Sequence, residues 1–149
     1  MSASALRDRR LLQLGALLFL LGLLAGIATP VAVHPRLGLA AHVEGVLNGL
    51  FLIALGLIWP RLALPDRALT ITYWLALYGT YANLGATGLA AVTGAAHMMP
   101  IAGGGLEGSS LEEGVMRTLL VSLSLAMLAV CGLVIVGLRG TEPVSAGTR

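Results

Sequence analysis

The sequence predicts an all-α integral membrane protein, a four-helix bundle with both termini in the cytoplasm. Three observations predict this fold: a mean hydropathy of +0.91, a hydrophobic fraction of 57% against 11% charged residues, and four long apolar stretches joined by short polar or glycine-rich links. A soluble domain carries about 25% charged residues. Because so few charges cannot form a water-facing surface, we exclude a soluble globular enzyme and a disordered chain.

Each apolar stretch is long enough to cross a bilayer, which takes about 20 residues. We expect spans over about 11–33, 37–59, 68–92 and 115–138. The first run is too long for the apolar part of a signal peptide and lacks a clear small-residue cleavage site, so we interpret it as a retained helix. Pro60 ends the second span because proline cannot continue a helix. A glycine-rich linker over 94–114 precedes the last span.

The arginines set the expected orientation. If the four spans cross the membrane in turn, only Arg36 and Arg117 fall on the side opposite to the termini. The positive-inside rule then places both termini in the cytoplasm. The arginines expected on the cytoplasmic side are Arg7, Arg9, Arg10, Arg61, Arg67, Arg139 and Arg149. We expect one multi-pass domain over 1–149 in the cell inner membrane. A net charge of +2 is too small for nucleic-acid binding, and a lone cysteine excludes an internal disulfide framework.

The second span carries the densest set of polar residues. At about 100° per residue, His42, Gly45 and Gly49 share one stripe, which leaves a flat shelf without side chains beside the imidazole. Glu44 and Asn48 form a second stripe about a third of a turn away. Polar groups inside a membrane are costly, so such a concentration indicates a functional site.

Structural explanations for the same residues stay open. Gly45 and Gly49 also fit a small-xxx-small contact between helices, which is the common use of paired small residues in membranes. Glu44 also fits an interfacial carboxyl group that is neutral or paired with Arg36 or Arg117.

The third span also carries polar residues. Asn83 and Thr87 lie one turn apart on one face, and Tyr81 lies with Gly85 and Gly88 on another. An asparagine in the middle of a span bonds to another helix or to a ligand. We therefore place Asn83 among the candidate site residues, with Thr87 and Tyr81 as weaker candidates.

A single histidine inside a span bears on a possible cofactor. His42 lies in a span, whereas His34 and His97 lie in or near external loops. Imidazole is the usual side chain that binds haem iron in a membrane bundle. One ligand would leave the sixth position open, which suits Lewis-acid chemistry better than electron transfer, unless His97 or Met98 supplies a second ligand. A structural histidine, hydrogen-bonded to a neighbouring helix, is the alternative.

Several short blocks resemble known enzymes over residues 11–138. Those that resemble the styrene oxide isomerase family are Ala41-His42-x-x-Gly45-x-x-Asn48-Gly49, Pro60 and Tyr81-Ala82-Asn83-x-Gly85. Those that are similar to the hydroxylaminobenzene mutases are Met98-Met99-Pro100 and the stretch 122–128. The resemblance implies trimeric four-helix membrane enzymes with haem b bound near the subunit interfaces.

By this resemblance, His42 would be the axial haem ligand, and Asn48 and Asn83 would line the distal, substrate side. Family isomerases have a tyrosine where this chain has Thr87 and an aspartate where it has Gly79. These departures favour the mutase branch over the isomerase branch.

The resemblance thus implies a mutase of nitroaromatic degradation that converts small arylhydroxylamines to 2-aminophenols, with ferric haem as the Lewis acid. Tyr81 or Glu44 would handle protons. One alternative is an epoxide-to-aldehyde isomerase of the styrene oxide type. Another is a non-enzymatic membrane subunit that carries haem or packs helices.

Overall fold

The computed structural model describes residues 3–140, and every regular element within them is a helix. The long helices are α1 (Ala3–Ala28), α2 (Pro35–Ile58), α3 (Asp66–Thr93) and α5 (Ser110–Leu138). The short ones are η1 (Thr29–Val31), η2 (Trp59–Arg61) and α4 (Pro100–Gly103). The all-α prediction is confirmed for these residues. Arg149, one of the arginines expected on the cytoplasmic side, lies outside the described residues.

Local signals in the sequence set the ends of the helices. Helix α2 ends just before η2, which contains Pro60, as expected. Helix α3 stops at Gly94, whose φ of 77° is a left-handed conformation that glycine adopts without strain. Helix α5 begins with a capping box, in which the Ser109 amide donates to Glu112 and the Glu112 amide donates to the Ser109 hydroxyl.

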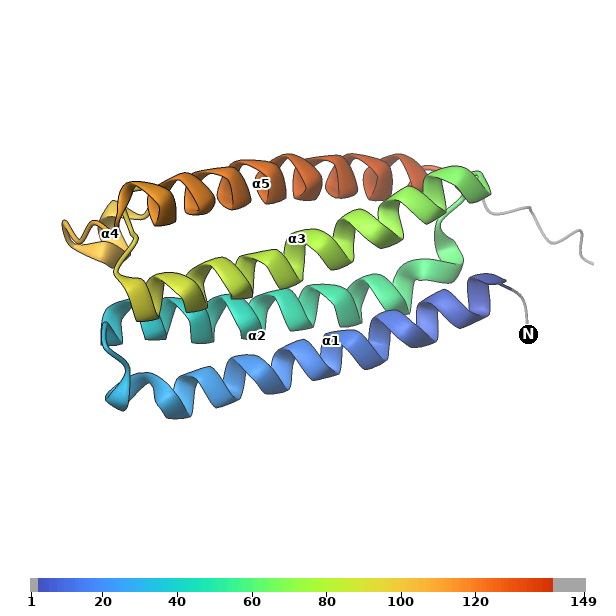
Figure 1. Cartoon of the computed structure of the whole chain (residues 1–149). Coiled ribbons are helices and arrows are strands. Elements are labelled where there is room, and N and C mark those ends of the chain that lie inside the picture. The colour runs from blue at the N-terminus through green and yellow to red at the C-terminus, as the bar shows by residue number, and fades with distance from the viewer. Residues whose placement is uncertain (1–2, 141–149) are drawn as a thin grey trace, which may run out of the picture.

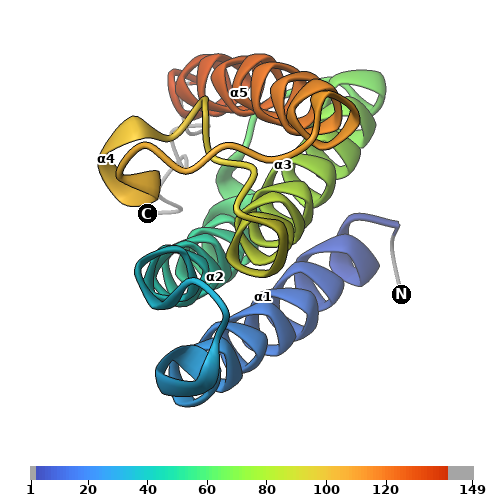
Figure 2. The same ribbon diagram turned by 60° about the vertical axis from the view of Figure 1, so that its left-hand side comes forward.

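The four long helices lie side by side in an open row (Figures 1 and 2). Helix α1 packs on α2, α2 on α3, and α3 on α5, so that α1 and α5 lie at opposite ends of the row. The order of packing was not predictable from the spans alone. It leaves a space between α2 and α5 on one side of α3, and α4 lies over the end of this space.

Three of the long helices, α1, α2 and α5, are long and apolar enough to cross a membrane. Helix α3 has 28 residues but is not among them. It buries three hydroxyl side chains, Thr72, Thr80 and Thr87. Each donates to a carbonyl oxygen one turn earlier in α3, so the hydroxyls are satisfied without water. The hydropathy therefore supports a membrane protein, in which α3 is the long helix that falls below the apolarity of a candidate span.

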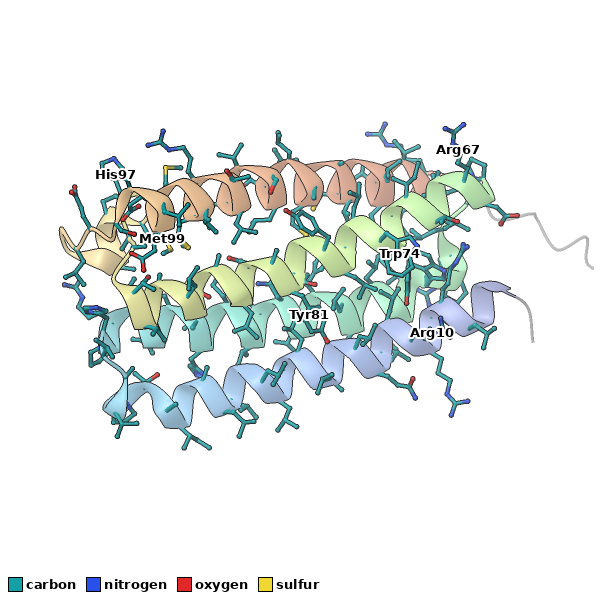
Figure 3. The ribbon with its side chains drawn as sticks, in the orientation of Figure 1. Arg10, Arg67, Trp74, Tyr81, His97 and Met99 are labelled. Atoms are coloured by element: carbon teal, nitrogen blue, oxygen red, sulfur yellow. The ribbon has the colours of Figure 1, made fainter. Side chains whose placement is uncertain are left out.

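Two of the basic side chains, Arg10 and Arg67, lie at the end of the molecule opposite to α4 (Figure 3). This is the end where α1 begins, α5 finishes and α2 connects to α3. His97 and Met99 lie at the opposite end, in the connection that contains α4. This separation is the one that the arginine pattern predicts.

Helices α1 and α2 approach each other through glycines. A Cβ added at Gly22 would lie 2.5 Å from the Val46 nitrogen and 2.6 Å from the Gly45 carbonyl carbon. A Cβ added at Gly49 would lie 2.5 Å from the Phe19 nitrogen. Backbone therefore meets backbone along this contact, which maximises van der Waals packing where apolar burial gives little driving force.

We predict that Gly22→Ala destabilises the protein by about 1–3 kcal/mol, because the added methyl group must push two backbones apart. Thermal unfolding in detergent measures the effect. The matched control is Gly85→Ala in α3, where an added Cβ meets nothing within 4 Å. This control should be neutral or stabilising by about 0.5–1 kcal/mol. Equal stability of the two variants would contradict the close contact.

Candidate functional site

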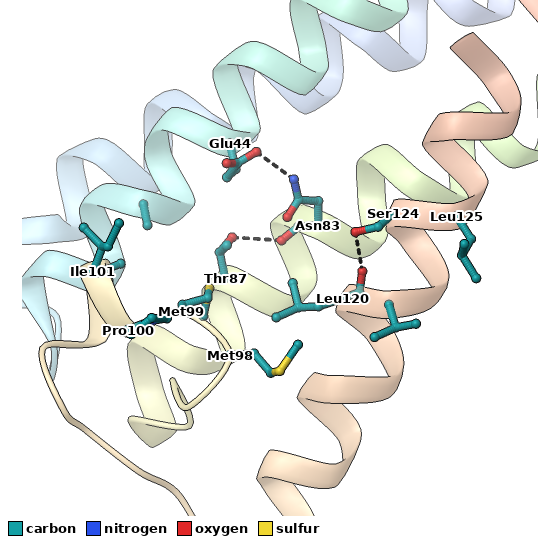
Figure 4. Close-up of a pocket in the computed structure, with 13 residues that line it drawn as sticks. Glu44, Asn83, Thr87, Met98, Met99, Pro100, Ile101, Leu120, Ser124 and Leu125 are labelled. Atoms are coloured by element: carbon teal, nitrogen blue, oxygen red, sulfur yellow. Dashed lines mark hydrogen bonds between the residues drawn. The ribbon is translucent and has the colours of Figure 1, made fainter. Parts of the chain in front are cut away.

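The space between α2, α3 and α5 contains a pocket of about 660 Å³ (Figure 4). It lies near the end of the row that carries α4, and α4 with the residues before it lines one side. The lining residues are Ala40, Glu44, Asn83, Thr87, Met98, Met99, Pro100, Ile101, Ala102, Leu120, Val121, Ser124 and Leu125. The pocket is thus apolar with a few polar groups, which is typical of sites for small aromatic molecules.

A carboxylate with two amide partners is the polar centre of the pocket wall. The Asn83 amide Nδ2 donates to Glu44 Oε2 at 2.6 Å (Figure 4). The Asn48 Nδ2 donates to the same oxygen at 3.3 Å. Asn48 is 9% exposed and does not line the pocket itself. The structure therefore brings together three predicted site residues from α2 and α3, and the bond from Asn83 joins the two helices.

Two hydroxyl groups complete the polar lining. Thr87 donates to the Asn83 carbonyl oxygen at 2.9 Å, and Ser124 donates to the Leu120 carbonyl oxygen at 2.7 Å (Figure 4). Both bonds stay within one helix. Because each hydroxyl proton is used in this way, the oxygens offer lone pairs to anything in the pocket.

Arg36 anchors the segment that covers the pocket and does not pair with Glu44. Its guanidinium donates to the Ile101 carbonyl oxygen at 3.0 Å. Within residues 3–140, the one ion pair joins His97 to Glu107. The open alternative that Glu44 pairs with Arg36 or Arg117 is therefore wrong, and two amides take the place of a cation.

His42 is held by α1. Its Nδ1 lies 2.8 Å from the Gly22 carbonyl oxygen, and the ring packs against Gly26, where a Cβ would meet it at 2.5 Å. As a donor to this carbonyl, Nδ1 fixes the tautomer and leaves Nε2 with its lone pair. No hydrogen bond to Nε2 occurs among the described residues. The ring borders a groove of about 580 Å³ with apolar side chains such as Leu23 and Ile27.

His42 and Glu44 lie on opposite sides of α2. Two residues along a helix are separated by a rotation of about 200° about the helix axis. The hydrogen bonds agree with this separation, because His42 contacts α1 whereas Glu44 contacts α3. His42 is absent from the lining of the Glu44 pocket. Within one chain, the predicted cofactor ligand and the predicted substrate residues therefore face different spaces.

The expectation of an open glycine shelf beside His42 needs correction. Helix α1 covers Gly45 and Gly49, because their missing side chains give room to the Gly22 and Phe19 backbones. The alternative of a small-xxx-small helix contact is the one that the structure contains. The physical reason is that α1 and α2 gain more contact by joining through the shelf than by leaving it open.

Tyr81 also lies away from the pocket. Its hydroxyl donates to the Leu14 carbonyl oxygen of α1 at 2.8 Å, and the side chain packs against the apolar core. It does not line the Glu44 pocket, so the expectation that it handles protons there is not supported by its position. Tyr81 lies on a different face of α3 from Asn83, and its hydrogen bond joins α3 to α1.

The α5 and α4 sides of the pocket were not predicted. Ser124 falls in the stretch 122–128 that resembles the mutases but was not a candidate site residue, and Met98 was considered only as a possible second iron ligand. Both line the pocket. His97, the other proposed second ligand, is exposed and pairs with Glu107 outside it. No pattern in one sequence tells which helix packs opposite α2.

A metal site built from protein side chains alone is not found within residues 3–140, where no group of three or more His, Cys, Asp or Glu lies together.

Comparison with known proteins identifies the family. The family model described as styrene oxide isomerase matches residues 7–139. The chain belongs to this family. It is 55% identical over 139 residues to hydroxylaminobenzene mutase HabB from Ectopseudomonas oleovorans, covering 93% of this chain and 85% of that protein. It is 46% identical over 125 residues to hydroxylaminobenzene mutase HabA from the same organism, covering 83% and 93%. No solved structure matches.

These comparisons confirm the resemblance and show that this member of the styrene oxide isomerase family is an isomerase. The alternative of a non-enzymatic subunit is therefore set aside. The resemblance implies an aspartate in the isomerases where this chain has Gly79. The space beside Gly79 is occupied by the Met127 side chain of α5, which would lie 2.6 Å from an added Cβ. A side chain at this position would require the Met127 side chain to move.

We predict that Asn83→Ala destabilises the protein by about 1.5–3 kcal/mol, because it removes a hydrogen bond to a carboxylate that joins α2 to α3. Thermal unfolding in detergent measures the loss. Ser124→Ala is the matched control, since its hydroxyl bonds only within α5 and its removal should cost about 0.5 kcal/mol or less. A similar loss in both variants would argue against a structural bond at Glu44.

Proposed function

We propose that this protein is a membrane-bound, haem-dependent mutase that converts arylhydroxylamines such as phenylhydroxylamine to 2-aminophenols. The observation that carries the proposal is the 55% identity, over most of the chain, to a protein named hydroxylaminobenzene mutase. The pocket lined by Glu44, Asn83 and Thr87 supports it, because its volume of about 660 Å³ has ample room for an aromatic ring and its walls are apolar with a few polar groups.

The proposal includes the topology. All four long helices cross the cell inner membrane as a multi-pass bundle, with both termini in the cytoplasm. The hydropathy of α1, α2 and α5 supports this arrangement, as does the gathering of Arg10 and Arg67 at one end. Helix α3 lies between α2 and α5, and its threonine hydroxyls are hydrogen-bonded within the helix. Both features lower the free-energy cost of placing α3 in hydrocarbon as a fourth span.

His42 fits the role of haem ligand. A histidine that binds a metal through one ring nitrogen typically donates its other N–H to a carbonyl or a carboxylate, and His42 Nδ1 meets the Gly22 carbonyl oxygen in this way. Its Nε2 has no partner among the described residues, and the groove beside it has the apolar lining that a porphyrin prefers. When bound, ferric haem would supply a Lewis acid for the oxygen of the hydroxylamine.

Because His42 and Glu44 face different sides of α2, we propose that a complete site needs two copies of the chain. The groove of His42 in one copy would face the Glu44 pocket of the next. Both lie near the end of the row where α2 begins, so they share one depth. Repetition of such a head-to-tail contact closes into a ring, which agrees with the trimer that the resemblance implies.

The side chains of the pocket have separate tasks in this proposal. Apolar residues such as Met98 and Leu125 hold the ring and exclude water, so that a cationic intermediate is not captured by solvent. The N–O bond breaks, the oxygen joins the ortho carbon, and the proton leaving that carbon balances the one gained at nitrogen. Asn83 holds the polar substituent beside Glu44, whose carboxylate is the nearest proton acceptor in the lining.

An epoxide isomerase of the styrene oxide type is the second candidate, because the family model carries that description. Measuring the turnover of phenylhydroxylamine and styrene oxide by one preparation separates the two. The mutase proposal requires that phenylhydroxylamine is the better substrate.

We predict that His42→Ala abolishes the Soret absorption of the purified protein. It should also lower kcat/KM for phenylhydroxylamine by about a hundredfold or more, since a Lewis acid contributes several kcal/mol. His97→Ala is the control, because His97 is exposed outside the pocket and should leave both properties intact. A normal haem spectrum with full turnover in His42→Ala would end the proposal.

A complementation experiment tests the two-copy site. His42→Ala and Asn83→Ala chains are each expected to be inactive alone. When the two are produced together, random mixing leaves about one interface in four with both native side chains, so about a quarter of the activity should return. If His42 and Asn83 of the same chain form the site, mixing restores nothing. Purified mixtures of the separately produced variants serve as the baseline.

A further inference from the structure

The protein side chains around the pocket present mainly hydrogen-bond acceptors. Glu44 Oε2 accepts from two amides, and no hydrogen bond to Oε1 occurs among the described residues. Asn83 directs a side-chain N–H to this carboxylate, and its side-chain oxygen Oδ1 has no donor within residues 3–140. The two strongest acceptors of the lining are therefore free to receive a hydrogen bond.

The two hydroxyl groups add to this pattern. Thr87 and Ser124 donate their protons to main-chain carbonyl oxygens of their own helices, at 2.9 and 2.7 Å. What remains on each oxygen is a lone pair. Met98 and Met99 contribute thioether groups, which accept weakly and donate nothing.

No cation neutralises the carboxylate. Arg36 donates to the Ile101 carbonyl oxygen, and no arginine lies within ion-pair distance of Glu44 in the described part of the chain. A partly buried carboxylate with free acceptor capacity is costly unless a ligand brings a donor to it. The free groups of the pocket thus define the chemistry of what it should hold.

We propose that Glu44 determines the specificity of the pocket by selecting aromatic molecules that carry N–H or O–H donors. The inference rests on the proposed function. An arylhydroxylamine has both donors on adjacent atoms, so one can reach the Glu44 carboxylate and the other the side-chain oxygen Oδ1 of Asn83. An epoxide carries only an acceptor oxygen, which finds no donor on the Glu44 carboxylate. Glu44 is thus the residue that separates a hydroxylamine substrate from an epoxide.

The test compares two ligands of nearly equal shape with the purified holoprotein in detergent. One is 2-aminophenol, which has N–H and O–H donors, and the other is 2-fluorotoluene, which has neither. Isothermal titration calorimetry gives the dissociation constants, after subtraction of the partition into empty micelles. We expect the native protein to prefer 2-aminophenol by about tenfold or more, since hydrogen bonds to charged groups are the strong ones.

The variant Glu44→Gln keeps the size of the side chain but replaces one acceptor with an N–H donor. It should reduce the preference to about threefold or less, because a neutral amide binds a donor more weakly than a carboxylate does. Glu107→Gln is the matched control, since it makes the same chemical change at an exposed carboxylate outside the pocket. This control should retain the native preference.

Two results would overturn the inference: no preference in the native protein, or an unchanged preference in Glu44→Gln whose unfolding temperature shows that it is folded. If Glu44→Gln does not fold, the comparison of the two ligands in the native protein still tests the inference, because equal affinities would overturn it. Turnover of phenylhydroxylamine is measured on the same preparation. Turnover without a donor preference would overturn the role of Glu44 and leave the proposed mutase activity standing. A Glu44-dependent preference without turnover would support the role of Glu44 and overturn the proposed mutase activity.

Discussion

The close contact between α1 and α2 is the constraint on which the rest of the site depends. In a lipid environment, helices gain little from burying apolar side chains against each other, so backbone contact through glycine is an effective way to join them. Gly22 and Gly45 allow that approach, and the Gly22 carbonyl oxygen then reaches the His42 ring. The same contact settles the rotation of α2 about its axis. Once the glycine stripe faces α1, the Glu44 stripe must face α3.

Helix α2 therefore has two faces with different chemistry. One carries an imidazole oriented by a main-chain carbonyl, and the other carries a carboxylate oriented by two amides. A soluble enzyme commonly folds such groups around a single cleft. The row of four helices does not do this, because no element within residues 3–140 lies over both faces of α2. The proposed association of two copies would bring the two kinds of group together.

The sequence was sufficient for what depends on local chemistry. Hydropathy and Pro60 gave the long helices and the end of α2, and the helical period gave the shared face of Glu44 and Asn48. It could not tell which helices would be neighbours, because one sequence holds no information about pairing. For this reason the glycine stripe was open to two interpretations, Tyr81 was placed in the site, and Ser124 was missed. The residues that bond across helices were the ones least accessible to prediction.

The polar character of α3 has a consequence for biogenesis. This helix falls short of the apolarity that the other three long helices reach, yet it lies between two of them. Asn83 finds its partner only on α2, which is made before it. We therefore expect the translocon to release α2 and α3 as a paired hairpin, because α3 on its own would partition poorly into the bilayer. The Glu44 side chain would then act first as an assembly contact during synthesis, before it contributes to the proposed site.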